Sequence, residues 1–131
     1  MVYEYKYIIL VLFAVILLSA GCKESPNLQP ELTGVWTRTI GSGEDTIEGI
    51  LKFDPDATFD FTFKGDSKNH EDTEGRYSLE GNQITFIDNS CVDAGTYTFM
   101  VRNNVLTFKE VKDDCGPRKA DLNGGWKRVE K

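Results

Sequence analysis

Histidine is almost absent from this sequence: His70 is the only one among 131 residues. It lies in a polar stretch beside Glu71 and Asp72, and no serine or cysteine has an evident histidine partner, so a hydrolase of the nucleophile–histidine kind is not indicated. Carboxylate pairs of the glycosidase type can be drawn among the many acidic residues, but nothing singles one out. The sequence has no Cys-x-x-Cys pair, and so the usual zinc motif is missing. We therefore expect no enzyme, no cofactor and no metal.

Positive charge is also in short supply. The chain has 15 lysines and arginines against 21 aspartates and glutamates, which gives a formal net charge of -6. Binding to nucleic acid requires clustered cations that meet phosphates, and peripheral binding to anionic lipid requires them as well. The balance argues against both partners and is ordinary for a soluble exported domain.

No apolar run is long enough to cross a bilayer comfortably. Residues 8–18 are continuously apolar, whereas a spanning helix needs about 20 such residues. A run of this length is typical of the core of a signal peptide.

Three small residues follow this run, namely Ser19, Ala20 and Gly21, and Cys22 comes next. The stretch resembles the lipobox of prokaryotic lipoproteins, in which the cysteine is lipidated and becomes the new N-terminus. The resemblance implies a signal peptide over 1–21, fatty acyl chains such as palmitate on Cys22, and a lipid-anchored protein of the cell envelope that lies outside the cytoplasm. The alternatives are a short membrane anchor, or a plain signal peptide followed by an incidental cysteine. The membrane that holds the lipid is left open.

If Cys22 carries a lipid, Cys91 and Cys115 remain as a pair. An even remainder in an exported protein usually means a disulfide, with two free buried thiols as the alternative. Residues 22–33 are polar and contain two prolines, so we interpret them as a flexible tether, with a short helical turn at Pro30–Leu32 before the folded domain.

From residue 34 to the end, short alternating segments recur with turn signals between them, which is the pattern of an antiparallel meander. The clearest is 58–64, where Phe59, Phe61 and Phe63 alternate with polar residues. No stretch shows a sustained helical period. The expected strands are eight: Gly34–Ile40, Thr46–Phe53, Thr58–Lys64, Thr73–Leu79, Gln83–Asp88, Gly95–Val101, Val105–Val111 and Trp126–Glu130.

Eight sequential antiparallel strands remove their exposed edges by closing into an up-and-down barrel. We therefore expect an all-β fold with one barrel domain over 34–131. All seven phenylalanines after Cys22 fall on one face, so this bulky set could fill the interior. The proposed inner residues are Trp36, Ile47, Leu51, Phe53, Phe59, Phe61, Phe63, Tyr77, Leu79, Ile84, Phe86, Tyr97, Phe99, Val101, Leu106 and Phe108.

In an antiparallel meander, successive connections lie alternately at the two ends of the barrel. The second, fourth and sixth connections are short and lie at the end where the tether enters. The first, third, fifth and seventh are longer and lie at the other end, where they bring Cys91 and Cys115 to the same side. The topology thus permits the disulfide, and any mouth of the barrel faces away from the membrane.

The motif Gly34-Val35-Trp36 on the first strand of such a meander resembles the start of the lipocalin-like (calycin) superfamily. The stretches 113–118 and 122–126 are similar to the end of small bacterial lipocalin-like domains. The resemblance implies that a basic residue of the last strand, here Arg128, covers Trp36 in a cation–π contact. This chain is much shorter than typical lipocalins and lacks their C-terminal helix, which argues against a large cavity.

Two functions follow from this fold. The first is a membrane-anchored lipoprotein whose barrel binds a small apolar ligand, with Trp36, Phe61, Tyr77 and Tyr97 lining the interior. The second is a filled barrel that grips a protein partner with its long loops, in the style of small barrel lipoproteins that inhibit lysozyme. A cavity favours the first function, and a packed core with a protruding loop favours the second.

Overall fold

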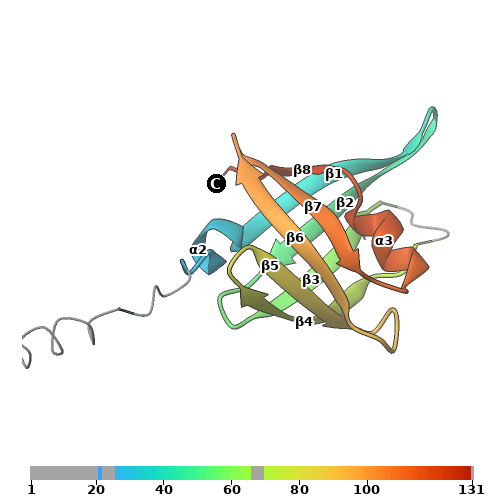
Figure 1. Cartoon of the computed structure of the whole chain (residues 1–131). Coiled ribbons are helices and arrows are strands. Elements are labelled where there is room, and N and C mark those ends of the chain that lie inside the picture. Colours follow the sequence, from blue (N-terminus) through green and yellow to red (C-terminus); the bar gives the residue numbers. More distant parts are fainter. Residues whose placement is uncertain (1–20, 22–25, 66–69, 131) are drawn as a thin grey trace, which may run out of the picture.

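Figure 1 shows the computed structural model, which describes Gly21 and residues 26–65 and 70–130. The expected signal peptide and Cys22 lie outside these residues, apart from Gly21. Among the described residues there are two short helices, α2 (Gln29–Leu32) and α3 (Gly116–Leu122). The strands are β1 (Gly34–Ser42), β2 (Asp45–Phe53), β3 (Thr58–Lys64), β4 (Thr73–Glu80), β5 (Gln83–Asp88), β6 (Gly95–Arg102), β7 (Val105–Lys112) and β8 (Gly125–Arg128).

The strands form one closed antiparallel barrel in sequence order, from β1 to β8 and back to β1. Trp36 and Thr37 of β1 pair with Arg128 and Lys127 of β8 and so close the ring. The expected eight-stranded up-and-down barrel is therefore confirmed. Strand boundaries differ from the expected ones by up to two residues, because twist and pairing rather than composition decide where each ladder ends.

The interior of the barrel is a continuous aromatic and aliphatic core. Phe86 is fully buried and packs against several other aromatic rings, with its ring centroid 5.0 Å from that of Phe59 and 5.8 Å from that of Tyr97. Phe63 and Phe108 are only partly buried. The buried cluster consists of Leu32, Trp36, Leu51, Phe53, Phe59, Phe61, Tyr77, Ile84, Phe86, Tyr97, Phe99, Leu106, Leu122 and Trp126.

One end of the barrel is closed by α2. The indole Nε1 of the buried Trp36 donates a hydrogen bond to the Leu32 carbonyl over 2.9 Å. The Arg128 guanidinium lies 4.1 Å from the centroid of the Trp36 ring, and it also donates hydrogen bonds to the carbonyls of Thr33 and Glu31. A cation over a ring face is attracted by the ring quadrupole. Arg128 thus ties β8, β1 and α2 together at this end.

Two connections differ from the sequence-based expectation. The first connection is not long: β1 and β2 continue to Ser42 and Asp45, and only Gly43 and Glu44 join them. A Cβ at Gly41 would lie 2.1 Å from the carbonyl oxygen of Asp45, so this twisted tip needs a glycine. The last connection is long, as expected, but it contains the helix α3, for which the sequence shows no helical period. A helix of seven residues has two turns at most, too few to show a helical period in the sequence.

In the part of the chain that the structure describes, no helix has the length and apolar character needed to cross a membrane.

Candidate functional site

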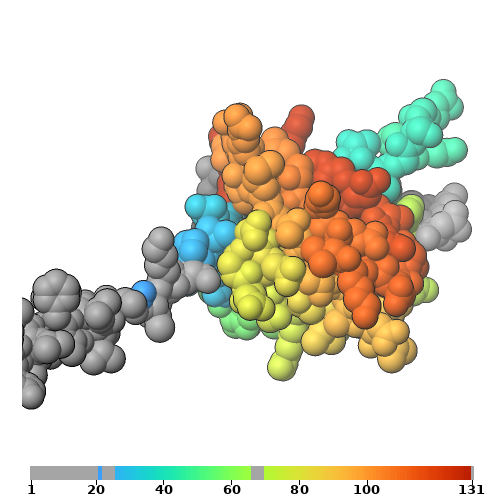
Figure 2. Space-filling model, viewed as in Figure 1, coloured from blue at the N-terminus to red at the C-terminus, as the bar shows by residue number. Residues whose placement is uncertain are grey.

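The helix α3 lies across the end of the barrel opposite α2 (Figure 1). The helix begins beside Pro117, whose fixed φ suits a first helical turn, and its side chains Arg118 and Leu122 are buried. Leu122 belongs to the same apolar cluster as Phe61 and Phe86. In the space-filling view α3 lies against the adjoining strands (Figure 2). A surface hollow of about 350 Å³ remains between them and is bordered by Phe108 of β7 and by Leu122 of the helix. We call α3 and the connections 70–72, 89–94 and 113–124 the plugged end.

The space beneath α3 is too small for an organic ligand. It amounts to about 20 Å³ and is bordered by Leu51, Phe59, Phe61 and Phe86 from the barrel and by Leu122 from the helix. A cavity of this size holds about one water molecule.

Two of the four expected ligand-lining residues lie in separate parts of the core. Trp36 is covered by Arg128 near α2, whereas Phe61 packs edge-on against Trp126, with 5.5 Å between the ring centroids. Both side chains are at most 4% exposed.

The other two, Tyr77 and Tyr97, are also buried and use their hydroxyls within the protein. Tyr77 donates a hydrogen bond to the Asp54 carbonyl over 2.9 Å, and Tyr97 donates one to the carboxylate of Asp113. The four residues therefore pack the barrel and do not together surround a space of ligand size. Tyr97 alone borders a hollow of about 350 Å³, which lies at the surface beside α3.

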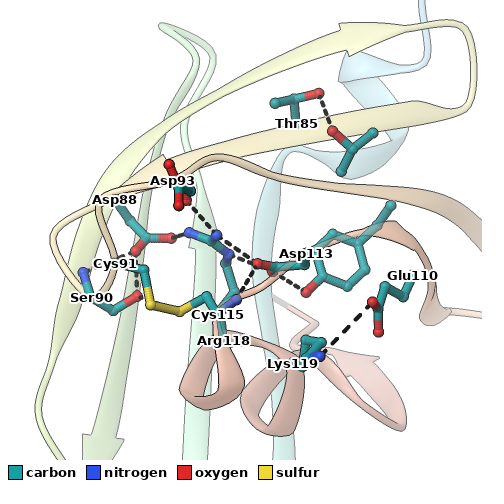
Figure 3. Close-up of polar contacts among 12 residues, drawn as sticks. Thr85, Asp88, Ser90, Cys91, Asp93, Glu110, Asp113, Cys115, Arg118 and Lys119 are labelled. Carbon is teal, nitrogen blue, oxygen red and sulfur yellow. Dashed lines mark hydrogen bonds and ion pairs between the residues drawn. A yellow bond between two sulfur atoms is a disulfide. The ribbon is translucent and has the colours of Figure 1, made fainter.

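A buried arginine holds α3 in place (Figure 3). Arg118 is 4% exposed and meets Asp113 side by side, with Nε 2.7 Å from Oδ2 and Nη2 2.8 Å from Oδ1. Its Nη1 donates to Asp88 Oδ2 at the end of β5 over 2.8 Å, and Nη2 also donates to the Asp93 carbonyl over 2.7 Å. The planar fork of arginine suits such paired contacts. One side chain thus joins α3 to β5, to the β5–β6 connection and to the end of β7.

Each carboxylate oxygen of Asp113 accepts two hydrogen bonds. Oδ2 accepts from Arg118 and from the Tyr97 hydroxyl, and Oδ1 accepts from Arg118 and from the Cys115 backbone N–H. Burial alone would raise the pKa of Asp113, but these hydrogen bonds outweigh it and lower the pKa to about 2. The same contacts raise the pKa of Arg118, led by its hydrogen bond to Asp113, while burial and the Asp113 carboxylate raise the pKa of Tyr97. Asp113 and Arg118 are therefore both ionised throughout the physiological pH range, and the Tyr97 hydroxyl is neutral.

A disulfide joins Cys91 and Cys115, with 5.9 Å between the Cα atoms, as the sequence predicts. Cys115 is the residue immediately before α3, and Cys91 belongs to the β5–β6 connection. The covalent tie and the Arg118 contacts therefore fix the same two connections to one another. Holding a loop of this length closed stabilises a fold by roughly 3.5 kcal/mol in the chain-entropy model.

On the opposite side of the mouth α3 is held more weakly. Arg38 of β1 donates one hydrogen bond of 3.3 Å to the Ala120 carbonyl, and its guanidinium lies 5.0 Å from the centroid of the Trp126 ring. Burial lowers the pKa of Arg38. Burial raises the pKa of Asp121 to about 6, against the opposing effects of His70 and Arg38. Asp121 makes no hydrogen bond or ion pair with another described residue, and its ionised form is therefore poorly compensated.

Sequence reasoning found the cysteine pair but missed the arginine. Arg118 follows Asp113 and Asp114 in a polar stretch, and nothing in the sequence marks its side chain as buried. Asp88, whose carboxylate also pairs with Arg118, is 30 residues away in the sequence. The sequence did contain one indication of this site, because Asp113 and Asp114 stand immediately before Cys115. A disulfide fixes the backbone next to it, so acidic side chains beside a paired cysteine can be held in place to bind a cation.

Comparison with known protein families, with curated proteins and with solved structures finds no match. The lipocalin-like resemblance therefore rests on the closed barrel, which is consistent with it, and on the short motifs of the sequence. No group of three or more metal-ligating side chains occurs within residues 26–65 and 70–130.

Replacing Arg118 by methionine should destabilise the fold by about 3–5 kcal/mol, because two buried carboxylates lose their cation. Urea unfolding measures the change. Adding Asp88→Asn and Asp113→Asn to Arg118→Met removes the uncompensated charges, and we expect it to recover at least about half of the loss. As a control, Lys119→Met on the same helix should cost less than about 1 kcal/mol, since that side chain is half-exposed. An equally small effect of Arg118→Met would contradict this account.

Replacing Asp121 by asparagine should stabilise the protein at neutral pH. The folded-state pKa lies above the unfolded value of 3.8, so the free energy of unfolding of the native chain falls as pH rises from about 4 to about 6 and stays lower above that. We expect Asp121→Asn to gain on the order of 1–3 kcal/mol at about pH 8 and close to nothing at about pH 4. Thermal unfolding at both pH values tests this, with Asp114→Asn, an exposed aspartate of the same connection, as the matched control. The idea fails if Asp121→Asn has the same effect at both pH values.

Proposed function

We propose that this protein is a non-catalytic lipoprotein of the cell envelope that is anchored through Cys22 and binds a basic protein partner with its plugged end. The observation that carries the proposal is the combination of a filled barrel with rigidly tied loops at one end.

The filled interior supports a role for the surface. Leu122 and Arg118 of α3 occupy the place where a ligand would enter, and about 20 Å³ remain below them. A small apolar ligand inside the barrel would require α3 to leave its place and the buried ion pairs of Arg118 to break. Binding at the outer surface requires neither change.

The tied connections support recognition of a partner by a fixed shape. A disulfide and the buried arginine hold the 89–94 and 113–124 segments in one arrangement. A loop that is already ordered loses little conformational entropy when it binds, so a given set of contacts yields a higher affinity. At the surface of these segments Val92 is fully exposed and is available for contact.

The charge of the plugged end supports a basic partner. Its connections contain six carboxylates and two cations. One of the carboxylates, Asp113, is paired with Arg118, while Glu71, Asp72, Asp93 and Asp114 are exposed to solvent. Complementary charge raises association rates and disfavours acidic competitors.

The position of the tether fits this use. The chain enters the barrel through α2, and α3 lies at the other end (Figure 1). With a lipid on Cys22, the plugged end points away from the membrane and toward a partner in solution.

A photo-crosslinking amino acid at Val92 should capture the partner in the cells that make this protein. We expect an adduct with a lysine- and arginine-rich protein, and a smaller yield as salt is raised, because surface charges are screened. A matched probe at Glu80, which is exposed at the α2 end, should give no such adduct. Equal capture at both positions, or none at Val92, would exclude the plugged end as the binding surface.

The anchor is tested separately in the same cells. Replacing residues 1–22 by a signal peptide that is removed without lipidation should move the chain from the membrane fraction to the soluble fraction while the barrel stays folded. Native mass spectrometry of the released protein then tests for a small molecule: a bare polypeptide mass fits the proposal, and a reproducible apolar adduct supports a ligand inside the barrel instead.

A further inference from the structure

The strand β1 is longer than its neighbour on one side. β8 pairs with β1 only at Trp36 and Thr37, whereas β1 continues to Ser42. Within the described residues no strand pairs with the β8-facing edge of Arg38–Ser42. The hairpin of β1 and β2 projects from the barrel here (Figures 1 and 2). An unpaired edge presents N–H and C=O groups that another strand can bind.

The ladder shows which residues face this edge. Residues of an antiparallel strand direct their backbone groups alternately to the two sides. The Val129 N–H donates to the Val35 carbonyl, so odd-numbered residues of β1 face β8, and Thr39 faces the unpaired edge. On β2, the pairing with β3 ends at Glu48 and Lys64, and the same alternation leaves Thr46 on the other edge of the hairpin.

The β1 edge borders a hollow in the surface. This hollow of about 490 Å³ is bordered by Arg38, Thr39, Lys127 and the glycines Gly124 and Gly125, and on the β2 side by Thr46 and Ile47. Glu48 also borders it, but its carboxylate is already paired with Lys64 at 3.3 Å. The hollow next to the β1 edge therefore has an excess of positive charge in a protein whose net charge is -6.

The edge itself has little of the usual protection against pairing. Beyond Arg38, residues 39–42 are Thr-Ile-Gly-Ser, without charge and without proline. Edge strands commonly carry lysine, proline or inward-pointing charges that prevent association. The tip next to this segment is acidic, with Glu44 and Asp45 both exposed.

We propose that two copies of this chain pair through the β1 edge, antiparallel and about a two-fold axis. The free segment 38–42 is centred on Ile40, so Ile40 of one copy lies opposite Ile40 of the other. The acidic tip of each copy, Glu44 and Asp45, then reaches the hollow with Arg38 and Lys127 of its partner. The same patch serves both copies, as a closed two-fold contact requires. This pairing does not depend on the proposed function.

The contact is short, and interfaces well below the standard size are weak. We therefore expect a reversible dimer that forms at high concentration, as on a crowded membrane, and not a permanent one. Sedimentation velocity of the full chain in detergent, up to about 1 mM protein, measures the dimer dissociation constant.

Proline substitution separates the two edges. Thr39→Pro removes a donor from the β1 edge and leaves the β1–β2 ladder intact, because the Thr39 N–H faces away from β2. We expect it to raise the dissociation constant at least about tenfold. Thr46→Pro makes the same exchange of residues on the other edge of the same hairpin and should leave dimerisation unchanged. Circular dichroism verifies that both variants keep the barrel.

Charge exchange tests the register and stays informative if a proline variant unfolds. Glu44→Lys and Lys127→Glu should each weaken the dimer, and the double variant should restore it. A chain that stays monomeric throughout, or a dimer that Thr39→Pro and the charge variants leave unchanged, would overturn the proposal. Assemblies larger than a dimer that Thr46→Pro abolishes would also overturn it, since they require the β2 edge.

Discussion

A guanidinium that is 4% exposed must have its N–H groups satisfied, because an uncompensated buried charge costs several kcal/mol. Arg118 meets this constraint by collecting groups from three parts of the chain: Asp88 at the end of β5, the Asp93 carbonyl in the next connection, and Asp113 after β7. These groups converge only when α3 lies across the barrel. The position of the plug and the arrangement of the neighbouring connections therefore depend on one side chain.

The remaining features of the plugged end follow from this arrangement. With Arg118 in place, Leu122 enters the aromatic core and leaves about 20 Å³ beneath it. The disulfide from Cys115 to Cys91 ties the same connections covalently. The interior of a small barrel is just wide enough for its own side chains. The helix that fills the core at this end therefore also fixes the outer connections. The arrangement favours recognition by surface shape and charge, and Arg128 over Trp36 seals the other end in a comparable way.

The barrel was predictable because its signals are local. The alternation of Phe59, Phe61 and Phe63 fixes a strand and its inward face, and Cys91 and Cys115 remain as a pair once the lipobox-like context sets Cys22 aside. The plug was not predictable for the opposite reason. Seven residues of α3 give no readable period, and Arg118 acquires its role from partners as distant as Asp88. The full length of the β1–β2 hairpin was missed because glycines such as Gly41 and Gly43 are typical of loops. In the structure the strand pairing continues to Ser42 and Asp45.

Native-state hydrogen exchange tests the central claim that α3 is a fixed part of the barrel. The diagnostic amides are those of Lys119 and Asn123, which donate to the carbonyls of Cys115 and Lys119 within the helix. If Arg118 locks the plug, both amides exchange only through global unfolding, at the same rate as core amides such as that of Tyr77. Exchange of the two helix amides through a separate, lower-energy opening, while the strands stay protected, would show that the plug moves independently and would contradict the account.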